Sequence, residues 1–180
     1  MNDDQSIRRS KQPNPLQQQL HLPDFSNYDW IKIALMDKSY INEAYVHNRQ
    51  HKEQLRLHHR RLAHLGDSIM NAAVTDYLFH KFPQADPGTL TKMAQSPKER
   101  RKGVLLYAKA VGLDRLCKLG NGICERDRAG DMFGEMFEAL IGAIYLSSNR
   151  DFALTRKWFL TQCAGVIDQQ LGENYSTGNA

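Results

Sequence analysis

Apolar residues recur at intervals of three or four along most of this chain. Between Leu62 and Phe82 this spacing places a continuous apolar stripe on an α-helix that ends before Pro83. No stretch alternates between apolar and polar residues over the length of a β-strand. The pattern therefore predicts an all-α protein. Other helices are predicted over residues 28–35, 55–65, 89–93, 99–113, 131–147 and 152–171, and loops over 42–50 and 116–130.

The two ends of the chain lack this periodicity. Residues 1–26 are polar and rich in Gln, so they offer little to bury, and we expect a disordered tail there. Residues 27–171 form one predicted domain, in keeping with a length of 180 residues. Residues 172–180 are again polar and are expected to be a second, short tail.

The composition, 41% hydrophobic and 24% charged residues, is typical of a soluble globular protein. The longest apolar run, 139–146, is much shorter than the ~20 residues that span a bilayer, so no membrane segment is expected. Cys117, Cys124 and Cys163 form no CxxC pair. This favours reduced thiols in a cytoplasmic compartment over disulfides or a zinc site.

The net charge of +4 is modest, but the basic residues are clustered. Between residues 45 and 66, five Lys or Arg residues and five His residues stand against a single acid, Glu53. A second cluster consists of Lys98, Arg100, Arg101 and Lys102. Such clusters suit a polyphosphate partner, although solvated helix faces would give the same pattern.

Four acids are placed unlike surface residues. Asp67 follows Gly66 inside a segment whose apolar neighbours are predicted to be core, so its carboxylate needs a partner. Asp131, Glu135 and Glu138 have the spacing i, i+4 and i+7, which puts them on one face of a helix. Stacked carboxylates repel one another unless a cation intervenes. We therefore expect these acids to meet Asp67 across a helix pair and to hold Mg²⁺, or Mn²⁺ in its place.

Two other interpretations of these residues remain open. In the first, Asp131 caps its helix, Glu135 is exposed and Glu138 pairs with a base such as Arg61. In the second, a metal is held by histidines, either His47 with His51 or His58 with His64.

Three blocks of the chain, in order, resemble the catalytic domain of the ribonuclease III family. Residues 34–43 (ALMDKSYINE) are similar to an ALTHRSYANE-type opening helix. Residues 61–68 (RLAHLGDS) resemble the RLEFLGDS signature, and residues 134–146 (GEMFEALIGAIYL) resemble an ADTFEALIGAIYL helix. The resemblance covers about residues 28–171.

The resemblance implies an all-helical endonuclease domain that cleaves double-stranded RNA as a symmetric dimer with Mg²⁺. By position, Asp67 and Glu138 match the family's two central metal ligands, and Glu135 stands where the family usually has Asp. Ala63 stands where most members have Glu, and Arg60 replaces another acid. The short subclass called Mini-ribonuclease III also has Ala before its own signature.

Full-length bacterial members continue into a double-stranded-RNA-binding domain, whereas only a polar tail is expected after Leu171. RNA would then be bound by the catalytic domain itself, through phosphates and 2′-hydroxyls. The short subclass suggests precursor ribosomal RNA as substrate. A rival reading is a non-catalytic, ribosome-associated RNA-binding protein with the same fold, which the replacements at 60 and 63 favour. The expected RNA contacts are Arg60, Arg61, Lys92, Lys98, Arg100, Arg101 and Lys102.

Overall fold

The computed structural model describes residues 14–123 and 131–176, apart from the side chains of 100, 101, 131 and 173–176. These residues form helices and no strand, which confirms the all-α class. The elements are α1 (Pro15–Gln19), α2 (Asp29–Ala34), α3 (Lys38–Ala44), α4 (Arg49–Lys81), α5 (Pro87–Lys98), the π-helix η1 (Arg100–Val104), α6 (Leu105–Ala110), α7 (Leu113–Leu116), α8 (Asp131–Ser147) and α9 (Phe152–Ser176).

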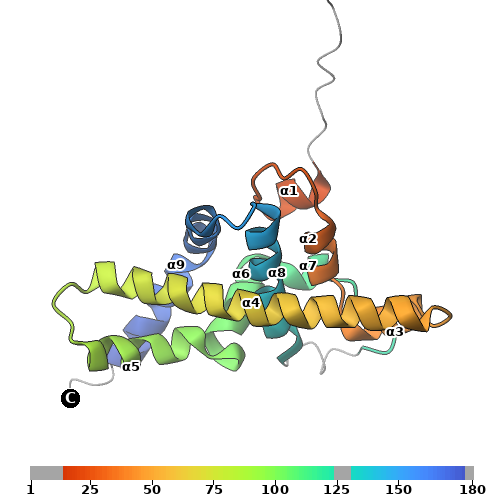
Figure 1. Ribbon diagram of the computed structural model, residues 1–180. Coiled ribbons are helices and arrows are strands. Elements are labelled where there is room, and N and C mark those ends of the chain that lie inside the picture. The colour runs from red at the N-terminus through yellow and green to blue at the C-terminus, as the bar shows by residue number, and fades with distance from the viewer. Residues whose placement is uncertain (1–13, 124–130, 177–180) are drawn as a thin grey trace, which may run out of the picture.

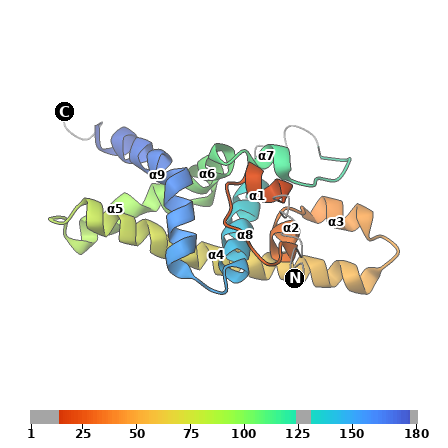
Figure 2. The ribbon, with the colours of Figure 1, turned by 90° about the horizontal axis from the view of Figure 1, so that it is seen from above.

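The long helix α4 forms one side of the molecule, and α8 runs across it near its middle (Figures 1 and 2). Its first turn is capped by Asn48, whose side chain accepts a hydrogen bond from the His51 amide at 3.0 Å. Helix α4 ends at Lys81, with Phe82 as its C-cap, because the following Pro83 has no amide hydrogen with which to continue the helix. The two predicted segments 55–65 and 62–82 are therefore parts of one helix.

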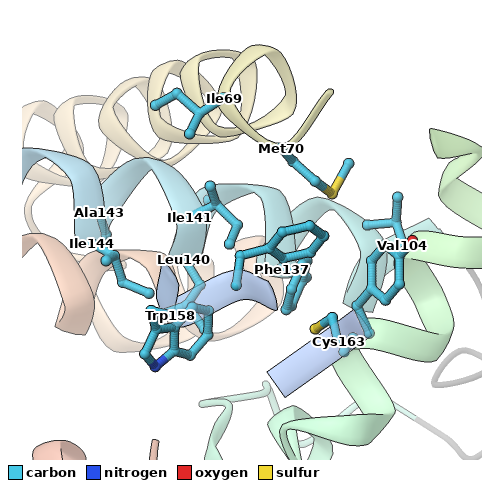
Figure 3. Close-up of a cluster of buried hydrophobic side chains, with 14 of the residues drawn as sticks. Ile69, Met70, Val104, Phe137, Leu140, Ile141, Ala143, Ile144, Trp158 and Cys163 are labelled. Carbon is cyan, nitrogen blue, oxygen red and sulfur yellow. The ribbon is translucent and has the colours of Figure 1, made fainter. Parts of the chain in front are cut away.

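The hydrophobic core surrounds α8 (Figure 3). Phe137, Leu140 and Ile141 are fully buried in α8. They pack among side chains of the neighbouring helices, including Met70 of α4 and Cys163 of α9. The apolar run that predicted the strongest helix is thus the centre of the protein, with the bounds predicted for it.

The expectation of a tail as far as residue 26 is wrong for residues 14–26. Leu20, Leu22 and Phe25 are buried in the main core. The indole Nε1 of Trp158 donates a hydrogen bond to the Leu20 carbonyl at 2.9 Å, which holds this segment on α9. These three apolar residues among polar ones have no helical periodicity. Their burial therefore could not be predicted from the local sequence, because it depends on packing against other parts of the chain. Residues 1–13 lie outside the described part of the chain.

Several predicted boundaries also move. The helix α5 begins at Pro87 rather than Thr89, because Asp86 accepts hydrogen bonds from the amides of Gly88 and Thr89. The predicted helix 99–113 is divided by η1 and ends where Gly112 adopts φ +65°. Likewise α3 and α4 take up most of the predicted loop 42–50. The last helix continues to Ser176, beyond the predicted 171.

Part of the predicted loop 116–130 is held against α3. The Asp37 amide donates to the Lys118 carbonyl at 3.0 Å, and the Gly120 amide donates to Ser39 Oγ at 3.0 Å. Glu43 accepts a hydrogen bond from the Asn121 amide at 3.0 Å. These contacts hold residues 118–121 against the start of α3; residues 124–130 lie outside the described part.

Candidate active site at the crossing of two helices

Two glycines allow the backbones of α4 and α8 to touch. A methyl group built on Gly66 would collide with the Glu138 carbonyl and lie 2.7 Å from the Gly142 amide nitrogen. A methyl group on Gly142 would collide in turn with the Leu62 carbonyl. The predicted ligand Asp67 is thus the neighbour in sequence of a crossing residue, and the backbone of the predicted ligand Glu138 lies at the crossing itself.

Asp67 is half-buried and is oriented by its own helix. Asn71, one turn further along α4, donates a hydrogen bond from Nδ2 to Asp67 Oδ1 at 3.1 Å. Lys98, from the end of α5, donates to Thr75 Oγ1 at 2.7 Å, one further turn along. Burial lowers the pKa of Lys98, and the negative charge of Asp67 raises it in opposition. The carboxylate thus lies in the field of an ammonium group.

The two acids of α8 have different surroundings. Glu138 is only 2% exposed and is engaged in an interaction within the protein. Glu135, one turn earlier, is half-buried and lines a cavity of about 270 Å³. Ala63 is buried on α4 one turn before Asp67, so this position contributes no oxygen ligand. The side chain of Asp131 lies outside the described part.

Among the described side chains, no group of three Asp, Glu, His or Cys residues is arranged to hold a metal ion. The predicted three-carboxylate set is therefore not a closed cage. Mg²⁺ is usually held by one or two carboxylates together with waters and substrate phosphates. Asp67 and Glu138, placed by adjoining helices, fit a site of that open kind; their assignment as ligands stays a prediction. The histidine alternative gains no support, since His58 lies edge-on to Trp30 at 5.5 Å.

The cavity beside Glu135 includes residues that the sequence did not bring forward. Its wall comes from α3, α4 and α8, and the residues that stand out are Lys38, Arg56 and the buried ring of His59. Arg56, His59 and Arg60 follow the spacing i, i+3 and i+4 on α4, which was the available signal. The spacing indicates only that these three residues share one face of α4. The cavity itself depends on the position of α3 beside that face.

The predicted RNA-contacting residues are spread over several elements. Arg60 and Arg61 are exposed on α4 close to the crossing, and Lys92 is exposed on α5. Lys98 bonds Thr75 as described, and Lys102 pairs with Glu99 at 2.8 Å. The side chains of Arg100 and Arg101 lie outside the described part. Arg60 lines the same cavity as Glu135, and Lys98 lies within the electrostatic influence of Asp67.

The first half of α4 also carries an open apolar groove of about 650 Å³. Leu57 is 54% exposed there, and Leu62, Leu65 and Leu146 contribute further apolar surface. His58, Arg60, Arg61 and His64 complete its wall.

This chain is similar to known ribonucleases. The family model of the ribonuclease III domain matches residues 60–149. Ribonuclease 3 of Sulfurovum sp. is 34% identical over 154 residues, which are 82% of this chain and 66% of that protein. Ribonuclease 3 of Listeria monocytogenes is 32% identical over 137 residues, 73% of this chain and 55% of that protein.

Solved structures show the same fold. Two structures of the nuclease domain of ribonuclease III from Campylobacter jejuni have TM-scores of 0.60 and 0.61 at 24% and 22% identity. They cover 82% and 89% of this chain and 95% and 93% of their own chains.

The chain belongs to the ribonuclease III domain family, as its three motifs predicted. It spans a little over half the length of the Listeria relative. No helix in the described residues is both long and apolar enough to cross a bilayer.

Proposed function

We propose that this protein is an endoribonuclease that cleaves double-stranded RNA as a Mg²⁺-dependent hydrolase, with Mn²⁺ as a substitute. The observation that supports this most directly is the placement of Asp67 and Glu138 at one backbone crossing, in a member of the ribonuclease III domain family. Two acids on adjoining helices would provide oxygen ligands at fixed positions, close to the exposed basic residues Arg60 and Arg61.

Each residue at the crossing has a distinct task in this proposal. Asp67 and Glu138 would hold the ion, and Glu135 would add a third negative charge within one helical turn. Asn71 keeps Asp67 Oδ1 in one orientation through its 3.1 Å hydrogen bond. When bound, a divalent ion would lower the pKa of the attacking water and neutralise charge that develops on the phosphate. Lys98 would help to attract the RNA phosphates.

RNA binding is assigned to the basic residues near the crossing. Arg60 and Arg61 on α4 and Lys92 on α5 are exposed, as a phosphate contact requires. Arg100, Arg101 and Lys102 are assigned by sequence. Affinity should fall steeply with salt, because each phosphate contact releases condensed counterions. Sequence preference should be weak, because A-form RNA is read through phosphates and 2′-hydroxyls.

The apolar groove on α4 supports a homodimer. An exposed Leu57 beside Leu65 and Leu146 is a surface that a second copy would cover, and Arg60 and Arg61 would then lie at the edge of the dimer. We place the protein in the cytoplasm, in keeping with the free thiols of Cys117 and Cys163. RNA processing, including that of precursor ribosomal RNA, is the proposed context.

A second candidate function is binding of double-stranded RNA without cleavage, for instance on the ribosome. Ala63 in place of an acid favours it, as does the lack of three clustered metal ligands among the described side chains. The retention of Asp67 and Glu138, which match the two central metal ligands that the family resemblance implies, favours the enzyme.

Cleavage of a long RNA duplex by the purified protein in Mg²⁺ tests the proposal. Loss of outer-shell groups at metal sites lowers activity about 10–100-fold, so Asp67→Asn and Glu138→Gln should each lose at least about 100-fold. Asp114→Asn, which removes an exposed acid on α7, is the matched control and should cleave normally.

Duplex binding by the wild type without any cleavage would favour the second candidate function. Equal cleavage by wild type, Asp67→Asn and Glu138→Gln would show that these two carboxylates are not the metal ligands.

A further inference from the structure

The cavity beside the candidate active site has a basic rim. Lys38 enters from α3, and Arg56 and Arg60 come from consecutive turns of α4. Lys38 and Arg60 have no ion-pair partner among the described side chains, and Arg56 makes only an exposed pair with Glu53 at 3.6 Å. Surface pairs of this kind contribute little, so all three cations are available to an anion.

The two acids of the cavity, Asp37 and Glu135, offset part of the charge of the three cations. Asp37 is 5% exposed and accepts hydrogen bonds from the amide and the hydroxyl of Ser39, so its carboxylate is occupied in capping α3. Glu135 lies at the α8 side, opposite the helix that carries the arginines. A ligand would therefore meet cations at the rim and an acceptor oxygen at the far wall.

The wall of the cavity also includes His59, whose ring carries a buried nitrogen without a partner among the described residues. His59 is 8% exposed, and its Nε2 has no hydrogen-bond partner among the described residues. The ring bonds the backbone of Ala34, the last residue of α2, so Nδ1 is the nitrogen that donates. Burial lowers the pKa of His59, while the charges of Glu135 and Asp37 and the Ala34 bond raise it less, so the ring is neutral at pH 7. Its Nε2 is then a lone-pair acceptor.

We propose that this cavity is a ribose-phosphate subsite, in which Lys38, Arg56 and Arg60 bind a phosphate and His59 Nε2 accepts a hydrogen bond from the adjacent 2′-hydroxyl. The hydroxyl end lies towards His59 and Glu135, which are both acceptors, and the phosphate lies at the basic rim. Less than 1 Å² of Nε2 is exposed, so the ligand displaces rim side chains. Arg56 and Arg60 have the rotamer freedom for this movement.

The natural source of the ligand is either the RNA strand or a free 3′-nucleotide. In both, a 2′-hydroxyl stands next to a 3′-phosphate. As a strand subsite the cavity rests on the proposed function, and it would make His59 a residue that distinguishes RNA from DNA. Arg60, which stands where relatives have an acid, would then be a gain in phosphate binding.

Calorimetric titration of the full chain, without divalent metal, tests the proposal with adenosine 3′-monophosphate and its 2′-deoxy analogue. One hydrogen bond gives about a fivefold preference for the ribonucleotide in the wild type. His59→Asn keeps a donor for the Ala34 carbonyl but removes the acceptor at Nε2, so the preference should disappear. His59→Gln restores an acceptor oxygen at that depth and should recover part of it. Arg60→Gln should weaken both nucleotides alike.

Two matched controls fall outside the cavity. His58→Asn changes the neighbouring histidine, which lies against Trp30, and Lys109→Gln removes an exposed lysine on α6. Both should bind like the wild type. Equal affinity of the wild type for the two nucleotides, or an unchanged preference in His59→Asn, would overturn the proposal. If His59→Asn does not fold, the wild-type preference and Arg60→Gln still decide it.

Competition with duplex RNA identifies the source. Displacement of the bound nucleotide by the duplex marks a strand subsite, and simultaneous binding marks a site for a free nucleotide. Nucleotide binding needs no cleavage, so a protein that binds 3′-nucleotides but leaves duplexes intact contradicts only the proposed function. A protein that cleaves RNA without the 2′-hydroxyl preference contradicts only this inference.

Discussion

At the scale of single residues, two glycines set the distance between α4 and α8, because glycine has only a hydrogen atom as its side chain. Gly66 and Gly142 each lie against the backbone of the opposite helix. Because backbone atoms cannot rotate away as side chains can, any Cβ at these positions forces the helices apart. The same contact places the backbone of Glu138 against Gly66, the residue before Asp67.

Gly66→Ala should therefore lower the free energy of unfolding by about 2 kcal/mol or more, since overpacking outweighs the better helix propensity of Ala. Urea denaturation followed by circular dichroism measures the change. Gly165→Ala is the matched control, because a methyl group there meets no atom within 4 Å on α9. It should stabilise the protein slightly, and equal effects at both positions would contradict the crossing as described.

The cysteines give a prediction about pH. Burial raises the pKa of Cys117 from 9.0 to about 12, and the charges of Asp37 and Asp114 add to the rise. Burial raises the pKa of Cys163 as well. A raised pKa keeps the thiol protonated, and only the thiolate reacts, so both cysteines should resist iodoacetamide up to about pH 10. Mass spectrometry of alkylated peptides checks this, with the urea-unfolded protein as the reactive reference.

At the scale of secondary-structure elements, the N-cap residue determines where helix α5 begins. The start of α5 is defined by Asp86, which accepts hydrogen bonds from the amides of Gly88 at 2.8 Å and Thr89 at 3.1 Å. The apolar pattern predicted this helix only from residue 89, two residues after its observed start. Asp followed by Pro at the first helical position was the better signal, since Pro fits a first turn that needs no amide donor.

Asp86→Ala should lower the melting temperature, through the loss of the cap of α5. Asp86→Asn keeps an acceptor oxygen of the same length and should be close to the wild type. Thermal melts of the two variants side by side make the comparison. A loss of the same size in Asp86→Asn would point to the charge rather than the hydrogen bonds.

Helix α8 was predicted with its observed bounds, while the segment 99–113 was not. Most residues of α8 between 133 and 144 are buried, and apolar residues on nearly every face of such a segment are a strong helix signal. The segment 99–113 has a similar apolar period but is interrupted by η1 and by Gly112 at φ +65°. The π-turn places Gly103 against the Pro97 backbone, a contact between residues that no periodicity encodes.

At the scale of the whole molecule, the open groove on α4 bears on assembly. Substituting Leu57 with Glu puts a charge on the apolar surface that a second copy would cover, which should weaken the proposed dimer at least about tenfold. Val46→Glu is the control, because Val46 is 59% exposed on the connection before α4 and outside the groove. Sedimentation velocity at several concentrations measures the result. A Leu57→Glu protein that still dimerises like the wild type would exclude this face.

The sequence alone determined the all-α class, the family, and the ends of α8. These follow from local periodicity and from motifs in which neighbouring residues act together. It also selected Asp67, Glu135 and Glu138, whose role as metal ligands stays a prediction.

Only the tertiary structure decided that residues 14–26 belong to the domain, that Glu135 lines a basic cavity, and that His59 bonds the end of α2. The physical reason is the same in each case. Burial of Leu20, the neutral ring of His59 and the backbone contact at Gly66 all depend on segments far apart in the chain. Helical periodicity reports which face of one helix is apolar, but not which helix will cover it.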